Sequence, residues 1–193
     1  TEVLQEDLKI DSFRWKTPQI GSVQNALMQV SLNNQDWHDV KDPTADSSYT
    51  YYASPHITQV DPNYGHVKAT KSSTIKITGT GFSCFDNDCS DLKCRFGNTP
   101  SSYIYVNATL VSSEEISCDA PLYTKPDVLK VEATINGESY TSDNKTYGYF
   151  DPFVLDAVPR LISTDGKTIV DIKGIGFANT GEAKSLYRNK SNP

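Results

Sequence analysis

The chain has little of what a membrane protein, a helical protein or a nucleic-acid-binding protein needs. No stretch of its 193 residues approaches the roughly 18 apolar residues of a membrane span. No segment keeps the period of about 3.6 residues that marks an amphipathic helix. The 18 basic residues are outnumbered by 24 acidic ones, for a net charge of −6. Because such a surface cannot neutralise phosphates, we expect no nucleic-acid partner, and no membrane span in this segment.

Catalytic and cofactor motifs are missing as well. The sequence contains no G-x-S-x-G or H-E-x-x-H motif, and its three histidines accompany no nucleophile motif. The glycines of Gly79-Thr80-Gly81 precede no signal for a helix N-terminus, so they do not indicate a phosphate loop. An acidic loop at Asp86, Asp88 and Asp91 lacks the glycine and the distal glutamate of a calcium loop. We expect a protein that is not an enzyme, with no catalytic residue, metal or cofactor.

The strongest feature that is present is an internal repeat. One set of residues recurs at an offset of 97, with Tyr52, Pro55 and Pro62 matched by Tyr149, Pro152 and Pro159. A second set recurs at an offset of 103, with Pro18 and Asn33-Asn34 matched by Pro121 and Asn136-Gly137. The chain is therefore predicted to be an array. Residues 55–150 form the complete unit, residues 1–54 the closing part of another, and residues 151–193 the opening part of a third. The chain begins at Thr1 without an initiator methionine, as a piece of a longer protein would.

Turn residues divide the complete unit into short strands about ten residues apart, the spacing of an immunoglobulin-like sandwich. The expected strands are residues 56–60, 74–78, 92–96, 103–106, 115–118, 128–135 and 147–150. Gly79 and Gly81 are expected to adopt positive φ angles and to turn Phe82 back onto the core. Asn136-Gly137 predicts a hairpin with residues 138–141 as the returning strand, and Asn33-Asn34 is expected to do the same in the first unit. The predicted fold class is all-β, with tandem immunoglobulin-like sandwiches, one complete and two partial.

Four cysteines and three glycosylation motifs favour the secretory pathway. Cys84, Cys89, Cys94 and Cys118 all lie in the complete unit, where their spacing matches no zinc knuckle and predicts disulfides. Four cysteines allow three connectivities. The N-x-S/T motifs at Asn107, Asn144 and Asn189 are candidate sites for N-linked glycans. An oxidising, extracellular or cell-surface location is the expectation.

Four motifs together resemble the IPT/TIG domain, an immunoglobulin-like fold of plexins, other receptors and certain transcription factors. They are Pro55 to Gly65 (P-x-I-x-x-V-x-P-x-x-G), Ile75 to Phe82 (I-x-I-x-G-x-G-F), Cys94 to Gly97 (C-R-F-G) and Ile116 to Pro121 (I-x-C-x-x-P). The resemblance covers residues 55–150 in full, residues 151–177 by the opening motifs and residues 10–54 by the closing motifs. It implies that Cys94 pairs with Cys118, which leaves Cys84 with Cys89. When residues 151–193 and residues 1–54 are aligned as the two halves of one unit, Tyr187 and Trp15 occupy the positions of Cys94 and Cys118.

Three functions follow as hypotheses. The first is a structural or adhesive extracellular glycoprotein, in which tandem IPT/TIG domains form a rigid string or filament. The second is the stalk of a plexin-like receptor ectodomain, and the third is an accessory domain of a secreted carbohydrate-active enzyme. Because an open half-sandwich exposes strand edges, the expected partners are proteins, namely other copies or neighbouring domains of the same chain, arranged head to tail. Tyr103 and Tyr105 alternate on one strand, where cross-strand pairing is favoured over a partner-stacking face.

Overall fold

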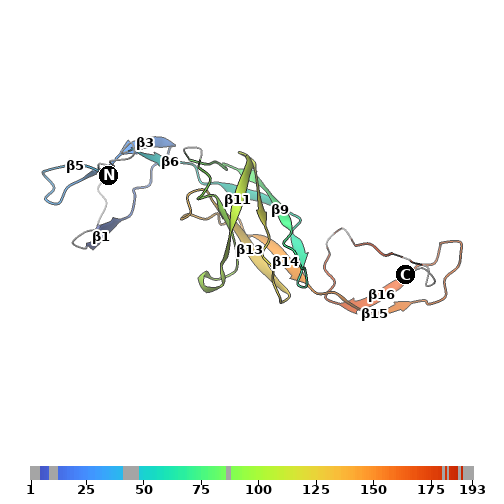
Figure 1. Cartoon of the computed structure of the whole chain (residues 1–193). Helices are drawn as coiled ribbons and strands as arrows, with labels where there is room; N and C mark the ends of the chain where they lie inside the picture. The colour runs from blue at the N-terminus through green and yellow to red at the C-terminus, as the bar shows by residue number, and fades with distance from the viewer. Residues whose placement is uncertain are drawn as a thin grey trace. The chain divides into compact units, whose positions relative to one another are not determined.

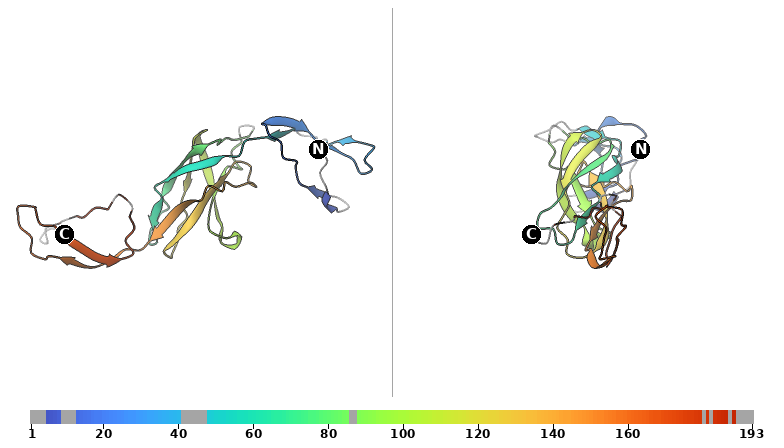
Figure 2. Two further views of the ribbon diagram at one scale, coloured as in Figure 1. Left: turned by 180° about the vertical axis from the view of Figure 1, so that it is seen from behind. Right: turned by 90° about the vertical axis from the view of Figure 1, so that its right-hand side faces the viewer.

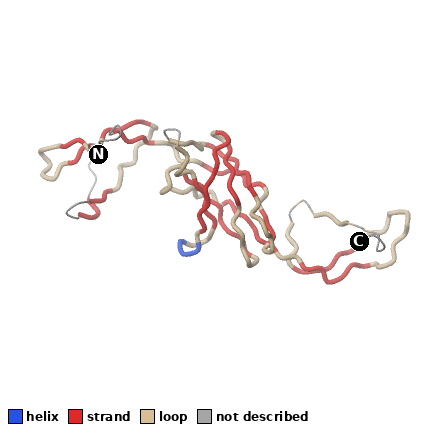
Figure 3. Tube along the Cα trace, viewed as in Figure 1, coloured by secondary structure: helices blue, strands red, loops and turns tan. Residues whose placement is uncertain are grey.

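The computed structural model describes residues 5–8, 13–40, 48–85, 88–179, 181, 183–186 and 188, with the side chains of residues 5–8, 13–15 and 48 left out. The chain divides into two compact units, Thr1–Ser54 and Pro55–Pro193. The expectations for Asn189 and Tyr187 lie outside the described residues. Nearly all regular structure is strand, as Figure 3 shows. In the described part of the chain no helix has the length and apolar character to span a membrane.

Residues 55–150 fold into two packed layers, antiparallel except where β8 pairs in parallel with β14, which are seen from three directions in Figures 1 and 2. The strands are β7 (His56–Asp61), β8 (Tyr64–His66), β9 (Thr74–Thr80), β10 (Lys93–Phe96), β11 (Ile104–Ser112), β12 (Glu115–Asp119), β13 (Asp127–Thr134) and β14 (Lys145–Phe150). They are hydrogen-bonded in the order β7-β9-β12-β11-β10-β13-β14-β8. The first half of β11 pairs with β10 and its second half with β12, so this strand joins the two layers. The predicted all-β, immunoglobulin-like class is confirmed.

The core lies between the layers and is filled by alternate residues of both. Ile75 and Ile77 of β9 are fully buried, and Phe82 is only 2% exposed. A side chain at Gly79 would overlap the carbonyl oxygen of His56 and lie 2.9 Å from the Phe82 ring. Gly79 is thus required by close packing, whereas Gly81 has the positive φ angle of 76° that turns the chain. The prediction that Phe82 packs onto the core is confirmed, and the positive φ predicted for Gly79 is wrong because β9 continues to Thr80.

Two strand predictions need correction. The strand expected to end at Val106 continues to Ser112, because its second half finds a partner in β12, so Asn107 lies within a strand and not after one. Residues 138–141 do not form the predicted returning strand. The Asn136 side-chain oxygen accepts hydrogen bonds from the backbone N–H groups of Glu138 and Ser139, which removes them from any ladder. Only Thr141 bonds back to Ala133.

The chain passes through this domain from one end to the other. Six successive antiparallel pairings connect β7 to β14, so the first and last strands run in the same direction. The start of β7 and the end of β14 therefore lie at opposite ends of the sandwich.

The described residues of the first unit form three short strand pairs. Its strands are β1 (Gln5–Leu8), β2 (Phe13–Trp15), β3 (Gln24–Leu27), β4 (Gln29–Val30), β5 (His38–Asp39) and β6 (Ser48–Tyr51). The Asn33 side-chain oxygen accepts hydrogen bonds from the backbone of Gln35 at 3.0 Å and Asp36 at 2.9 Å. This turn repeats the one at Asn136, 103 residues later, and Asn34 has a φ of 58° where Gly137 has 74°. The prediction that the two turns correspond is confirmed.

A hairpin after residue 150 repeats the geometry of β7 and β9. It consists of β15 (Phe153–Val158) and β16 (Asp171–Ile175). Val154 pairs with Gly174 as Ile57 pairs with Gly79, and a register shift follows both pairs at the same position. Phe177 contacts Gly174 as Phe82 contacts Gly79. The two copies differ in burial: Phe177 is 54% exposed, whereas Phe82 is 2% exposed.

Candidate functional site

The outer face of the layer formed by β10, β11 and β13 carries a cluster of charged and aromatic side chains. Arg95 of β10 lies opposite Tyr105 of β11 on one side and Glu132 of β13 on the other. Lys93 occupies the next outward position and lies opposite Asn107. Alternation along the strands therefore places these polar residues on one face, while Cys94 and Phe96 point into the core.

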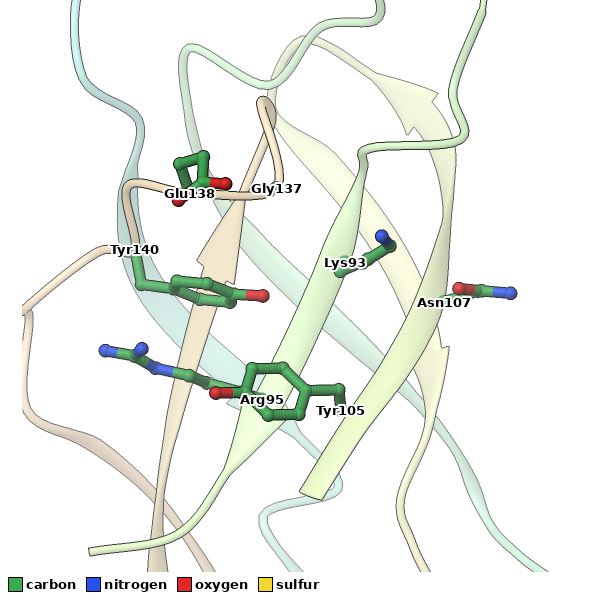
Figure 4. Close-up of a pocket in the computed structure, with 7 residues that line it drawn as sticks. All are labelled: Lys93, Arg95, Tyr105, Asn107, Gly137, Glu138 and Tyr140. Atoms are coloured by element: carbon green, nitrogen blue, oxygen red, sulfur yellow. The ribbon is translucent and has the colours of Figure 1, made fainter. Parts of the chain in front are cut away.

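Arg95 is the centre of the cluster. Its Nε donates to Glu132 Oε2 at 2.6 Å, and its guanidinium carbon lies 4.2 Å from the ring centroid of Tyr103 and 4.0 Å from that of Tyr140. The Tyr105 ring lies 6.2 Å from the Tyr103 ring and 6.0 Å from the Tyr140 ring, centroid to centroid. Figure 4 shows the rings of Tyr140 and Tyr105 close to the Arg95 side chain. The ring contacts join Tyr105 to Tyr103, two residues away, and to Tyr140, which lies outside the strands, so the cross-strand interpretation of Tyr103 and Tyr105 stays a prediction.

Electrostatics and packing fix the arrangement of this cluster. Partial burial lowers the pKa of Arg95, but the hydrogen bond and charge of Glu132 outweigh it and raise the pKa overall. Burial, followed by the neighbouring Tyr105, raises the pKa of Tyr140. Beside the cluster lies an open hollow of about 410 Å³ lined by Lys93, Arg95, Tyr105, Asn107, Gly137, Glu138 and Tyr140. Arginine framed by tyrosines is typical of protein contact surfaces.

The glycosylation motifs that the structure describes are both accessible. Asn107 is exposed in the middle of β11, and Figure 4 shows its amide pointing away from Arg95 and the Tyr105 ring. Asn144 is exposed immediately before β14, with a φ of 54°. Neither side chain belongs to the buried core.

Asp143, next to Asn144, contacts the first two residues of β7 through its carboxylate. Its carboxylate accepts a hydrogen bond from the backbone N–H of Ile57 at 2.7 Å and contacts His56 Nδ1 at 3.0 Å. Burial would raise the pKa of Asp143, but these two partners together lower it below the ordinary value.

The cysteines fall into two pairs. Cys84 and Cys89 form a disulfide with Cα atoms 4.8 Å apart. Cys94 of β10 and Cys118 of β12 belong to different layers and meet across the core as two buried thiols. The hydrogen bond with Cys94, followed by burial, raises the pKa of Cys118. The bridge between Cys94 and Cys118 stays a prediction.

The comparison with protein families agrees with this architecture. The IPT/TIG domain family matches residues 55–149, the span of the sandwich. The central domain of this chain belongs to the IPT/TIG family. No curated protein matches the chain. Among solved structures, a protein of unknown function from Bacteroides thetaiotaomicron is 17% identical over 59% of this chain and 24% of its own, with a TM-score of 0.40. The full extracellular region of plexin A4 is 13% identical over 80% of this chain and 13% of its own, with a TM-score of 0.45. The chain thus spans a quarter or less of either structure.

Sequence reasoning missed the centre of the polar cluster on this IPT/TIG domain. It treated Arg95 only as part of the C-R-F-G motif and gave Glu132 and Tyr140 no role. A signal was available, because Arg95 and Glu132 each alternate with apolar residues of expected strands and so had to face outward. Their pairing required the order of strands in the sheet, which the sequence alone does not supply.

Proposed function

We propose that the chain is a section of a structural or adhesive extracellular glycoprotein, in which tandem immunoglobulin-like domains form a rigid string or filament. The observation that carries the proposal is that β15 and β16 repeat the register of β7 and β9. We assign residues 151–193 to the opening part of a further IPT/TIG-like domain and residues 1–54 to the closing part of another, on either side of the domain at residues 55–150.

The topology of the central domain supports a spacer role. The chain enters at one end of the sandwich and leaves at the other, which is the arrangement that a spacer between two domains needs. Only Asp151 and Pro152 separate β14 from β15. Lys68 Nζ donates to Asp151 Oδ1 at 2.9 Å, which fastens this short connection to the domain. The same topology suits the stalk of a cell-surface receptor, which is the second candidate.

Two features favour an extracellular location. The disulfide between Cys84 and Cys89 is typical of oxidising compartments. Asn107 and Asn144 are exposed acceptors, and glycans on them would cover part of the surface between partners. The partners are other domains of the same kind, held head to tail.

Secretion of the chain from eukaryotic cells tests the extracellular assignment. We expect N-linked glycans at Asn107 and Asn144, each lost in the corresponding Asn107→Gln or Asn144→Gln variant and removed by a peptide N-glycosidase. Thr109→Ala is a matched control, because it destroys the first motif while Asn107 stays in place. Intact-mass spectrometry that finds neither site glycosylated in the secreted, folded protein would contradict the assignment.

A further inference from the structure

The hollow beside the Arg95 cluster includes a glycosylation motif in its own wall. Asn107 forms one part of that wall and Tyr105 forms another. The two residues are two positions apart on β11, so their side chains leave the same face of the sheet. Thr109, which completes the motif, is also exposed. A glycan attached at Asn107 therefore starts at the edge of the hollow, next to an aromatic ring.

The Tyr105 ring is the most open aromatic surface of the hollow. It is 55% exposed, whereas Tyr103 and Tyr140 are partly buried. The Arg95 guanidinium lies over the rings of those two tyrosines. An exposed aromatic ring can bind the face of a sugar, because the C–H bonds of the sugar lose contact with water and point at the negative face of the ring.

Two charged side chains add hydrogen-bonding groups to the hollow. Lys93 lies directly opposite Asn107 in the register of β10 and β11, and Glu138 lines the same hollow. In the described part of the chain, neither the Lys93 ammonium nor the Glu138 carboxylate takes part in an ion pair. The ammonium can donate to the oxygens of a sugar, and the carboxylate can accept from its hydroxyl and amide groups. The hollow thus combines an aromatic ring with a donor and an acceptor, which suits a sugar.

The Asn107 side chain has the freedom to turn toward this hollow. In Figure 4 its amide points away from the Tyr105 ring. Asn107 is exposed, and among the described residues its side chain forms no hydrogen bond. Two χ1 rotamers are common in strands, and exposed side chains change between rotamers within nanoseconds. Such a rotation brings a sugar on the amide toward the ring with no change in the backbone.

We propose that the glycan on Asn107 folds back over the hollow, with its first sugar, an N-acetylglucosamine, stacked on the Tyr105 ring. Lys93 and Glu138 hydrogen-bond the polar groups of that sugar. The inference rests on the proposed glycoprotein and gives the face of the Arg95 cluster an occupant. The glycan is that occupant because its attachment residue is part of the hollow, and a tethered group binds at a high effective concentration. This face is then closed to other chains, and head-to-tail contacts lie elsewhere.

The rate at which the glycan is released from the folded protein tests the contact in the secreted 193-residue chain. A peptide N-glycosidase acts on the native protein, and mass spectrometry follows Asn107 and Asn144 separately. Tyr105→Thr removes the ring but keeps a residue that favours strands, and we expect it to speed release at Asn107 roughly fivefold. Tyr105→Phe keeps the ring and should release this glycan at the original rate. Release at Asn144, which has Ser142 and no aromatic residue two positions before it, should be the same in all three proteins.

A cycle of melting temperatures separates the sugar contact from the ring's own part in the fold. Thr109→Ala removes the glycan and leaves Asn107 in place, and it is combined with Tyr105→Thr. We expect loss of the glycan to lower the melting temperature by about 2–8 °C more when the tyrosine is present than when it is replaced. The intrinsic cost of each substitution cancels in this difference.

Each result supports the proposal or overturns it. Release at Asn107 that Tyr105→Thr leaves unchanged overturns the proposal, as does a cycle in which the two effects simply add. Equal acceleration at Asn107 and Asn144 would show a general loosening of the domain and would also overturn it. A secreted chain without a glycan at Asn107 overturns it too, but the extracellular assignment fails only if Asn144 is bare as well. The two failures are therefore distinguishable.

Discussion

Replacement of Phe82 by alanine tests the account of the core. Phe82 is 2% exposed and packs against Gly79, where no side chain fits. Truncation of such a buried phenylalanine costs about 3–5 kcal/mol through lost burial and the cavity left behind. A domain of this size is stable by roughly 5–14 kcal/mol, so the substitution removes a large part of its stability. Its melting temperature should fall by about 12–40 °C.

Phe177→Ala is the matched control, because Phe177 has the same local geometry but is 54% exposed. We expect it to shift the melting transition of the central domain by less than about 0.5 kcal/mol. Both tryptophans, Trp15 and Trp37, lie outside residues 55–150, so their fluorescence does not report on this domain. Calorimetry and hydrogen exchange in peptides from β9 provide the signal. Equal effects of the two substitutions would refute the assignment of Phe82 as a core anchor.

Two further predictions concern Asp143 and the buried cysteines. Asp143→Ala should cost about 1–3 kcal/mol at neutral pH, because the Ile57 N–H loses a charged acceptor. Since the folded state lowers the pKa of Asp143 below its ordinary 3.8, this stabilisation is present above that value and is lost as the pH falls through the folded pKa. Denaturation curves of the two proteins should therefore converge in acid, and a constant difference would contradict the reasoning. Peptide mapping of the secreted protein without reductant should find Cys94 joined to Cys118, and a free Cys94 thiol would exclude that bridge.

Much of the fold could be predicted from local sequence patterns. The alternation in residues 74–78 predicted β9 because two isoleucines two residues apart must share a face, and both are buried. The Asn33 and Asn136 turns could be matched from sequence because the side chain of one residue forms each turn. The full length of β11 could not be predicted, since its second half is a strand only through its pairing with β12.

The site was less accessible to sequence reasoning than the fold. Exposure of Asn107 follows from alternation, but its place beside the Arg95 cluster depends on which strands are neighbours. The contact of Tyr140 with Arg95 depends on the path of residues 138–141, which the Asn136 turn redirects away from the expected strand. Long-range order of this kind is a property of the sheet, and no single segment encodes it.

The central claim is that this chain forms one section of a longer string of immunoglobulin-like domains. Electron microscopy of the secreted protein at increasing concentration tests it most directly. One complete sandwich and two partial units per molecule, joined head to tail, predict unbranched strings with an axial repeat of roughly 70–90 Å. Single particles with one sandwich each, at every concentration, would contradict the claim.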